Sequence, residues 1–256
     1  MFCPLASGSR GNSIYIGSQR TKILIDAGLS GKETAKRLEQ IGVALEEIDA
    51  ILITHDHIDH IQGLKVLGLR HNIPILANAE TAKGIHNLLD TCPKFRIFET
   101  GETFEFQDLV IHPFSISHDT VDPVGFTIET MGHKIGLCTD LGFVTTLVKR
   151  HLRDCDYLYV EANHEPEWVH ACPRPLVYKQ RVLSRSGHLS NEACAALLAE
   201  VMHAGLKHVH LAHLSQECNC PERALERVRA RVGEALALSV APQEQIGKAV
   251  VFASTP

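Results

Sequence analysis

The sequence THDHIDH, residues 54–60, follows the apolar run 50–53 and holds three histidines and two aspartates. The apolar run, AILI, predicts a buried strand. A solvated loop after such a strand usually carries Lys, Glu, Ser or Gly, whereas histidines interleaved with carboxylates suit a bound cation. The segment therefore predicts a metal centre at the end of this strand, with a polar turn as the alternative interpretation.

Four predicted strands run into a residue that can bind a metal ion. The strands and the residues after them are 50–54 with His55, 109–117 with His118, 134–139 with Asp140, and 208–212 with His213. Loops that leave rigid strands at one edge of a sheet hold their side chains in fixed positions. Agreement among the four strands favours one shared site over four accidental placements.

The spacing of apolar residues predicts strands and helices along the whole chain. Further strands are predicted at 13–17, 22–26, 73–77, 96–98, 125–129, 157–161 and 249–252. Helices are predicted at 32–41, 63–70, 79–89, 141–150, 191–203 and 221–237, with Ser190 as the N-cap of the fifth. We predict one α/β domain over residues 1–256, with two sheets packed face to face and helices outside. The stretch 166–185 is the least regular, and we interpret it as an insertion at the rim of the site.

Composition narrows the class of protein. The chain has 256 residues and a net charge of −5 at pH 7, so it lacks the basic footprint of many nucleic-acid-binding proteins. No apolar stretch of about 18 residues and no signal-peptide pattern is present, so we expect a cytoplasmic protein without membrane contact. The eight cysteines form no CxxC pair, which argues against a disulfide framework. Cys218 and Cys220 form the closest pair, and a second small metal site there stays open.

Several motifs together resemble the metallo-β-lactamase superfamily. The HxHxDH pattern within LITHDHIDHIQGL, the histidine of ISHD, the aspartate of LCTDLG and the late histidine of LAHLS carry this resemblance. The motifs SGSRGNS, EANHE and SGHLSN resemble the YycJ/WalJ-like branch, and SGHLSN together with LAHLS narrows the resemblance to it. The resemblance covers nearly the whole chain. It implies an αββα four-layer sandwich, with two mixed sheets flanked by helices and two divalent metal ions at one edge.

The resemblance also implies how the ligands divide between the two ions. One ion would be held by His55, His57 and His118, the other by Asp59, His60 and His213, and Asp140 would bridge them. Backbone geometry agrees with this division, because alternate residues of an extended segment, such as His55 and His57, point the same way. Histidine and aspartate ligands accept Zn²⁺, Mn²⁺ and Fe, so the identity of the metal stays open.

The charge of this ligand set favours an anionic substrate. Two M²⁺ ions would keep a charge of about +2 after five neutral imidazoles and two carboxylates have bound them. Such a centre lowers the pKa of bound water and stabilises displacement at phosphorus. The resemblance to the branch implies a 5′-to-3′ DNA exonuclease that acts in DNA repair on duplex DNA. Asp59 and Asp140 would then serve in catalysis as well as in metal binding.

We expect His188 to take part in catalysis. It precedes a predicted helix whose N-terminus favours anions, and in related phosphodiesterases the matching histidine contacts the scissile phosphate or protonates the leaving oxygen. A histidine bonded to the backbone of a capping loop is the alternative. We expect further substrate contacts from Ser9, Asn12, His164, Asn191, Arg181 and Arg185.

Plain structural roles stay open for several of these residues. The loop with Ser9 and Asn12 offers hydroxyls and an amide to a phosphate, or forms a polar hairpin turn. His164 follows a strand and could line the site or bind a metal ion directly. Four basic residues lie close together in the sequence, at Arg174, Lys179, Arg181 and Arg185. They could steer a nucleic-acid backbone toward the metal ions, or they could belong to a solvated loop.

Other functions share parts of this pattern. Endonucleases that process tRNA 3′ ends have similar ligands and a similar GH[ST] motif, but their long tRNA-binding arm has no obvious counterpart here. A small-molecule phosphodiesterase and a thioester hydrolase are further alternatives. A di-iron, oxygen-reducing protein would usually carry a carboxylate in place of His57, and an inactive metal-binding regulator would not need all seven ligands.

Overall fold

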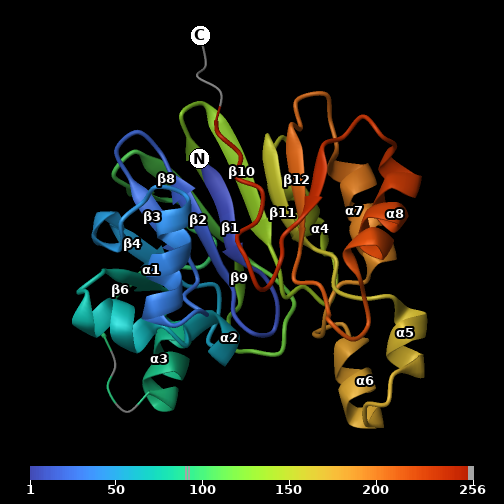
Figure 1. The fold of residues 1–256 in the computed structure, drawn as a ribbon, viewed down its shortest axis with the longest axis horizontal. Helices are drawn as coiled ribbons and strands as arrows, with labels where there is room; N and C mark the ends of the chain where they lie inside the picture. The colour runs from blue at the N-terminus through green and yellow to red at the C-terminus, as the bar shows by residue number, and fades with distance from the viewer. Residues whose placement is uncertain (90, 92, 253–256) are drawn as a thin grey trace.

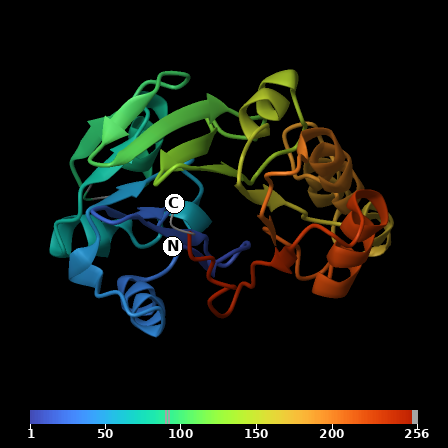
Figure 2. The ribbon, with the colours of Figure 1, turned by 90° about the horizontal axis from the view of Figure 1, so that it is seen from above.

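In the computed structural model, which describes residues 1–89, 91 and 93–252, two β-sheets face each other (Figures 1 and 2). The first sheet has six strands in sequence order. They are β1 (Phe2–Ala6), β2 (Ser13–Gly17), β3 (Lys22–Ile25), β4 (Ala50–Leu52), β5 (Ile75–Ala77) and β6 (Phe95–Ile97). The first three strands pair antiparallel, and β3 to β6 pair parallel, so the sheet is mixed.

The second sheet has seven strands, which run in reverse sequence order from β13 to β7. They are β7 (Phe104–Phe106), β8 (Leu109–Ser115), β9 (Val124–Thr130), β10 (His133–Cys138), β11 (Tyr157–Glu161), β12 (His208–Ala212) and β13 (Leu238–Val240). Pairing is antiparallel from β7 to β10 and parallel from β10 to β13. Each sheet is therefore built from one continuous half of the described chain.

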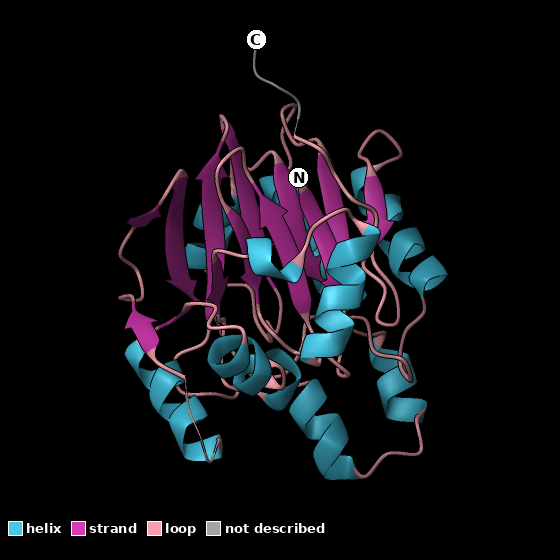
Figure 3. Cartoon of the chain, turned by 60° about the vertical axis from the view of Figure 1, so that its left-hand side comes forward, coloured by secondary structure: helices cyan, strands magenta, loops and turns pink. Residues whose placement is uncertain are grey.

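Helices cover the outer faces of both sheets and gather along one edge (Figure 3). The longer helices are α1 (Gly31–Gln40), α3 (Ala79–Leu88), α7 (Asn191–Val201) and α8 (Pro221–Val232). The shorter ones are η1 (Leu45–Glu47), α2 (Ile58–Ile61), a π-helical segment η2 (Lys65–Arg70), α4 (Thr146–Leu152), α5 (Pro166–Ala171) and α6 (Leu176–Val182). No helix in the described part of the chain is long and apolar enough to cross a bilayer.

Alternation along the strands divides the core into layers. Ile23 and Ile25 of β3 join the cluster between the sheets, whereas Leu24 joins the cluster under α1 and α3. A strand that is buried on both faces must be apolar throughout, which explains the continuous apolar runs of β3 and β4. A third cluster packs α4, α7 and α8 on the second sheet. The result is the predicted αββα sandwich.

Two sequence predictions on local structure were wrong, and three strands were missed. The stretch 166–185 is not irregular, because it forms α5 and α6, each begun by a proline at or before its first turn. The stretch 249–252 is not a strand, although Val250 forms an isolated antiparallel bridge to Phe2. The short strands β1, β7 and β13 were not predicted. In Figure 1, α5 and α6 lie at the lower right, below the second sheet and the helices α7 and α8.

Candidate metal centre

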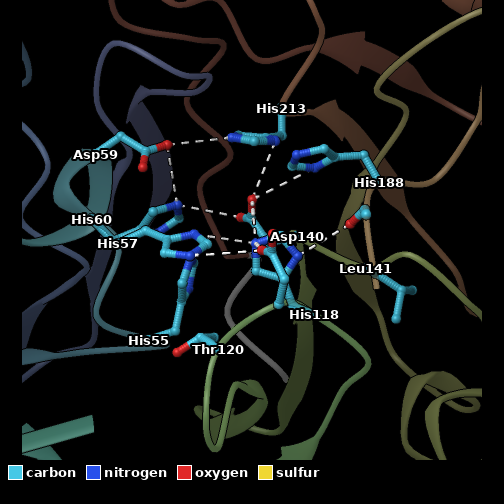
Figure 4. A network of polar contacts seen from close by, with 12 residues as sticks. His55, His57, Asp59, His60, His118, Thr120, Asp140, Leu141, His188 and His213 are labelled. Atoms are coloured by element: carbon cyan, nitrogen blue, oxygen red, sulfur yellow. Dashed lines mark hydrogen bonds and ion pairs between the residues drawn. The ribbon is translucent and has the colours of Figure 1, made fainter. Parts of the chain in front are cut away.

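The predicted ligands meet where loops leave strands of both sheets (Figure 4). The loop after β4 brings His55 and His57, and α2 brings Asp59 and His60. The second sheet supplies the remaining three from the ends of β8, β10 and β12, which are His118, Asp140 and His213. The site thus spans the edge between the two sheets.

Close contacts within the site follow the predicted division. His55, His57 and His118 present ligand atoms that all lie within 4.8 Å of one another, and so do Asp59, His60 and His213. Asp140 belongs to two further groups of this kind, one of which it forms with His55 and His60. The second joins it to Glu161, His188 and His213. Asp140 therefore lies between the two sets of histidines.

In four of the histidines, a neighbouring oxygen faces Nδ1. The Nδ1 of His60 lies 2.7 Å from the carboxylate of Asp26, and that of His213 lies 2.9 Å from Glu161. The Nδ1 of His55 lies 2.9 Å from the hydroxyl of Thr54, and that of His118 lies 3.1 Å from the Gly187 carbonyl. Because a neutral imidazole that donates from Nδ1 carries its lone pair on Nε2, these contacts prepare Nε2 as a ligand.

Three buried atoms of the site form no hydrogen bond with the described residues. They are Nε2 of His55, Nε2 of His213 and Oδ2 of Asp140. The Asp140 oxygen lies 3.3 Å from Nε2 of His60 but without the alignment of a hydrogen bond. Buried polar atoms are normally satisfied, so orphaned acceptors within one cluster of imidazoles and carboxylates fit bound divalent cations. The donor set of imidazoles and carboxylates suits Zn²⁺, Mn²⁺ or Fe.

Electrostatics in the cluster are dominated by the pairing of imidazoles with carboxylates. Burial opposes the charge on His60, but the carboxylates of Asp26 and Asp140 outweigh it and raise the pKa of His60 well above its usual value. Burial also opposes the charge on His213, yet Asp140 and other acids raise its pKa to about 10. Burial and the neighbouring His60 hold the pKa of His55 well below its usual value. A metal ion must therefore displace a proton from His60 and from His213, whereas the ring of His55 is already neutral.

Three residues of the site have an unusual backbone conformation. Asp26, Asp140 and His213 have φ values of 62°, 57° and 54°, in the left-handed region that L residues seldom adopt. Asp26 and His213 follow directly on the last residue of a strand, and Asp140 lies two residues after the end of β10. Such conformations persist where surrounding contacts enforce them, and they concentrate at functional sites. Here they turn the chain sharply so that the side chain after each strand faces the site.

Two supporting carboxylates, Asp26 and Glu161, were missed by the sequence analysis. Asp26 accepts hydrogen bonds from the backbone and hydroxyl of Thr54 as well as from His60. Glu161 is fully buried and lies 2.9 Å from Nδ1 of both His188 and His213. Both residues lie at strand ends, so the rule that found the ligands could have found them too.

His188 lies against the cluster but outside the predicted ligand sets. Its Nδ1 faces Glu161 at 2.9 Å and Asp140 at 3.8 Å. Its ring packs beside those of His118 and His213, with centroids 5.3 Å and 5.2 Å away. Its side chain is 15% exposed, whereas that of His118 is 1% exposed. His188 is therefore held at the open side of the cluster.

The loop between β1 and β2 touches the ligands from one side. The Asn12 amide is buried and lies 3.2 Å from Asp59 and 3.0 Å from Nε2 of His60, while its oxygen accepts from Gly8. Ser9 lies exposed at the tip of the same loop. The hydroxyl of the preceding Ser7 accepts a hydrogen bond from the backbone of His213. The loop is thus part of the site's wall, and only its tip is free to meet a ligand.

His164 and Asn191 lie deeper. His164 is 2% exposed, faces Asn163, and belongs to none of the clusters that could hold a metal ion among the described residues. Asn191 is fully buried, and its amide group bonds to Glu165 and Asn219. The structure therefore does not bring either residue to the open side of the ligand cluster.

Each of the four basic residues in 174–185 already contacts another group of the protein. Arg174 pairs with Glu217, and the Lys179 ammonium donates to the His170 carbonyl. Arg181 pairs with Asp119, whose carboxylate also lies 3.4 Å from Nε2 of His118. Arg185 lies over the ring of Phe143, with its guanidinium carbon 4.0 Å from the ring centre. Of the four, Arg181 and Arg185 border the metal centre.

A family model described as the beta-lactamase superfamily domain matches residues 21–213, a range that includes all seven predicted ligands. The chain belongs to the metallo-β-lactamase superfamily. Among the superfamily's curated members, exodeoxyribonuclease YycJ of Bacillus anthracis is 37% identical over 244 residues, 91% of this chain and 92% of the relative. Exodeoxyribonuclease WalJ of Streptococcus pneumoniae serotype 2 is 39% identical over 225 residues, 86% of this chain and 83% of the relative.

Solved structures of metallo-β-lactamase fold proteins share the architecture. YhfI from Bacillus subtilis superposes with a TM-score of 0.71 at 15% identity, covering 96% of this chain and 98% of that one. The short form of human tRNase Z superposes with a TM-score of 0.67 at 17% identity, with the same coverage. Identities this low establish the fold alone. The identities to YycJ and WalJ place the chain in the predicted YycJ/WalJ-like branch. The protein is a metal-dependent hydrolase.

Proposed function

We propose that the protein is a phosphodiesterase with two divalent metal ions and acts as a 5′-to-3′ exonuclease on duplex DNA during repair in the cytoplasm. The observation that carries the proposal is the pair of ligand groups, His55–His57–His118 and Asp59–His60–His213, on either side of Asp140. The likeness to two exodeoxyribonucleases over most of the chain supports DNA as substrate. Bound divalent ions would supply a water of lowered pKa and stabilise negative charge on the phosphate.

The chain's own residues have separate tasks in this proposal. Asp26, Thr54 and Glu161 orient the ligand imidazoles. Glu161 also faces Nδ1 of His188, which leaves Nε2 of that ring as the nitrogen for proton transfer. Hydrolysis breaks the bond between phosphorus and the leaving oxygen, water adds to phosphorus, and the leaving oxygen takes a proton. We assign that proton to His188.

Recognition of the DNA end falls to the rim of the site. Ser9 at the loop tip, and Arg181 and Arg185 beside the ligands, are the candidates for contacts with phosphate. Phosphate contacts position a strand without reading its sequence. The enzyme should therefore depend on salt concentration and on the chemistry of the DNA end far more than on base composition.

The deciding experiment compares end-labelled substrates with the purified protein loaded with Zn²⁺ or Mn²⁺ in parallel. We expect label to leave the 5′ end of duplex DNA first, and a 5′-phosphate to be degraded faster than a 5′-hydroxyl. An Asp140→Asn variant serves as the inactive control, and His86→Ala, on an exposed face of α3, as the active one. Efficient cutting of closed circular DNA, or faster cleavage of a tRNA precursor, would refute the proposal and favour an RNA-processing endonuclease.

A further inference from the structure

An aromatic ring and an arginine form an exposed pair beside the metal centre. The side chain of Phe143 is 41% exposed, which is unusual for phenylalanine, and Arg185 is exposed as well. The guanidinium of Arg185 lies 4.0 Å from the centre of the Phe143 ring, within the range of a cation–π contact. At an exposed position such a contact adds little to stability, so stability alone gives no reason to keep the ring in water.

The backbone holds this pair in place. The hydroxyl of Ser117 donates to the carbonyl of Arg185, and the amide of Gly142 donates to the carbonyl of Ser117. A Cβ atom on Gly142 would lie 2.5 Å from both the Arg185 carbonyl oxygen and the Gly187 amide, closer than real side chains approach. The loops that carry Phe143 and Arg185 are therefore packed backbone to backbone, which only glycine at position 142 permits.

The same two loops carry groups of the proposed site. Phe143 follows Asp140 by three residues, and Arg185 precedes His188 by three residues. The Gly187 carbonyl also faces Nδ1 of His118 at 3.1 Å. The exposed pair is thus connected through short, rigid segments to the groups that meet the scissile phosphate. That proximity places it within reach of the nucleotide next to the cleaved bond.

We infer that the pair Phe143–Arg185 is a stacking platform for an unpaired nucleobase next to the scissile phosphate. This inference rests on the proposed nuclease function and specifies how the substrate strand is held. Nucleobases stack on aromatic rings and on guanidinium planes regardless of their identity. Because a paired base has its faces covered by its neighbours in the duplex, the strand must leave the helix before it reaches the platform.

The charge around the pair agrees with this role. Arg174 and Arg181 are each engaged by a carboxylate, whereas no carboxylate among the described residues pairs with Arg185. Its positive charge is thus available to a phosphate as well as to a base. Tight sequence preference is not expected, since stacking supplies no hydrogen-bond code.

The test is a double-mutant cycle between the protein and the strand. Single-stranded oligonucleotides with a 5′-phosphate carry an abasic residue at one position at a time near the 5′ end. The metal-loaded wild type, Phe143→Ala and Phe143→Tyr are compared by kcat/KM. Each value is divided by that variant's kcat/KM for methyl p-nitrophenyl phosphate, a small diester without a base, which corrects for changes at the metal centre. Circular dichroism checks that the variants fold.

For the wild type, we expect one position at which loss of the base lowers normalised kcat/KM by about 5- to 100-fold. Phe143→Ala should show a similar loss on the intact strand and no further loss at that position, and Phe143→Tyr should resemble the wild type. Leu147→Ala is the matched control, because Leu147 is also 41% exposed but lines a different hollow with His112 and His151.

Two outcomes would overturn the inference in distinguishable ways. If Phe143→Ala cleaves the intact strand as well as the wild type does, or keeps the penalty at the sensitive position, the platform is wrong while the nuclease assignment stands. If the wild type hydrolyses methyl p-nitrophenyl phosphate but neither these strands nor duplex DNA, the proposed function fails and the platform with it.

Discussion

Glu161 shows how much of the site depends on one buried side chain. A buried carboxylate is unfavourable unless several donors satisfy it, and Glu161 accepts from the backbone amides of Leu141 and Leu189. Burial alone would raise the pKa of Glu161, but His188 and His213 lower it to about 2. The carboxylate therefore stays charged and joins the loop after Asp140, the loop at His188 and the end of β12.

We expect His188→Ala to separate chemistry from metal binding. The variant should keep the metal content of the wild type, because all seven proposed ligands remain. Its kcat should fall by about 10²- to 10⁴-fold, the usual contribution of a positioned acid or base. Metal analysis and steady-state kinetics on the same preparation check this. A variant without metal would instead make His188 a ligand.

A second residue-scale prediction concerns acid stability. His210 is fully buried, where burial, and then the charges of His208 and Lys248, lower its pKa to about 3. Its other neighbours include the hydroxyl of Ser239 and the rings of Phe2 and Tyr159. The unfolded chain binds a proton at the ordinary histidine pKa of about 6.5, so stability falls as pH drops below that value and levels off near the folded pKa.

His210→Leu removes this proton linkage. Between pH 7.5 and pH 5, we expect the free energy of unfolding of the wild type to fall by about 2 kcal/mol more than that of the variant. Denaturant titrations at the two pH values measure the difference, in which any constant packing loss cancels. His86→Leu, an exposed site on α3, should change with pH as the wild type does. An equal pH dependence in His210→Leu would show that His210 ionises normally.

At the scale of elements, the sequence predicted the limits of some strands and missed three other strands. The predicted limits of β2, β11 and β12 agree with the structure, because each is a buried apolar run with clear ends. The N-cap at Ser190 is confirmed by its hydrogen bond from the amide of Ala193. The strands β7 and β13 have three residues each, too few for a period to be visible, and the five-residue β1 was also missed. The pair α5 and α6 was missed because prolines suggested a loop where they begin helices.

The ligands of the candidate site were predictable because they also contrast clearly with the residues around them. Its ligands lie after strands, where an imidazole or a carboxylate stands out against apolar neighbours. Asp26 and Glu161 obey the same rule, but nothing in a linear sequence shows that a carboxylate faces a histidine from another strand. The pairing of Phe143 with Arg185 depends on the approach of two loops and has no local pattern either.

A substitution at Gly28 tests how closely α2 packs against the β1–β2 loop. Gly28 follows β3, and a Cβ atom there would lie 1.7 Å from the carbonyl of Asp59 and 2.4 Å from the amide of Asn12. We expect Gly28→Ala to push α2 away from the β1–β2 loop, to lower stability by about 3 kcal/mol or more, and to weaken metal binding. Thermal unfolding and metal titration measure both effects. Gly205→Ala is the control, since only the movable ring of His203 lies nearby, and similar behaviour of the two variants would argue against close packing at Gly28.

At the scale of the whole molecule, the proposed metal centre joins the two sheets. Four of its residues come from the first sheet's side, namely His55, His57, Asp59 and His60, and three come from the second. A ligand that binds the folded chain alone stabilises it by mass action, about 2.7 kcal/mol at a concentration 100 times its Kd. Metal ions should therefore hold the two halves of the sandwich together as well as support hydrolysis.

We expect removal of metal by a chelator to lower the Tm by about 5–10 °C, from that free energy and the usual size dependence. Calorimetry of the metal-loaded and chelated protein measures the change. A His57→Ala variant should show a much smaller shift, because one ligand group is broken before the chelator acts. An unchanged Tm after complete removal of metal would show that the sheets dock without help from the site.

Because the two sheets are formed by consecutive parts of the chain, the proposed metal ligands are synthesised in a fixed order. A ribosome delivers all the strands of the first sheet by residue 97, and with them the cluster from His55 to His60. His118 and Asp140 emerge later, and His213 is the last of the seven proposed ligands to be made. Since folding during synthesis starts from the N-terminus, the nascent chain carries an incomplete metal site until His213 has been made. Full loading must wait for that residue, so an ion captured earlier would be held by an incomplete set of ligands and remain easy to exchange.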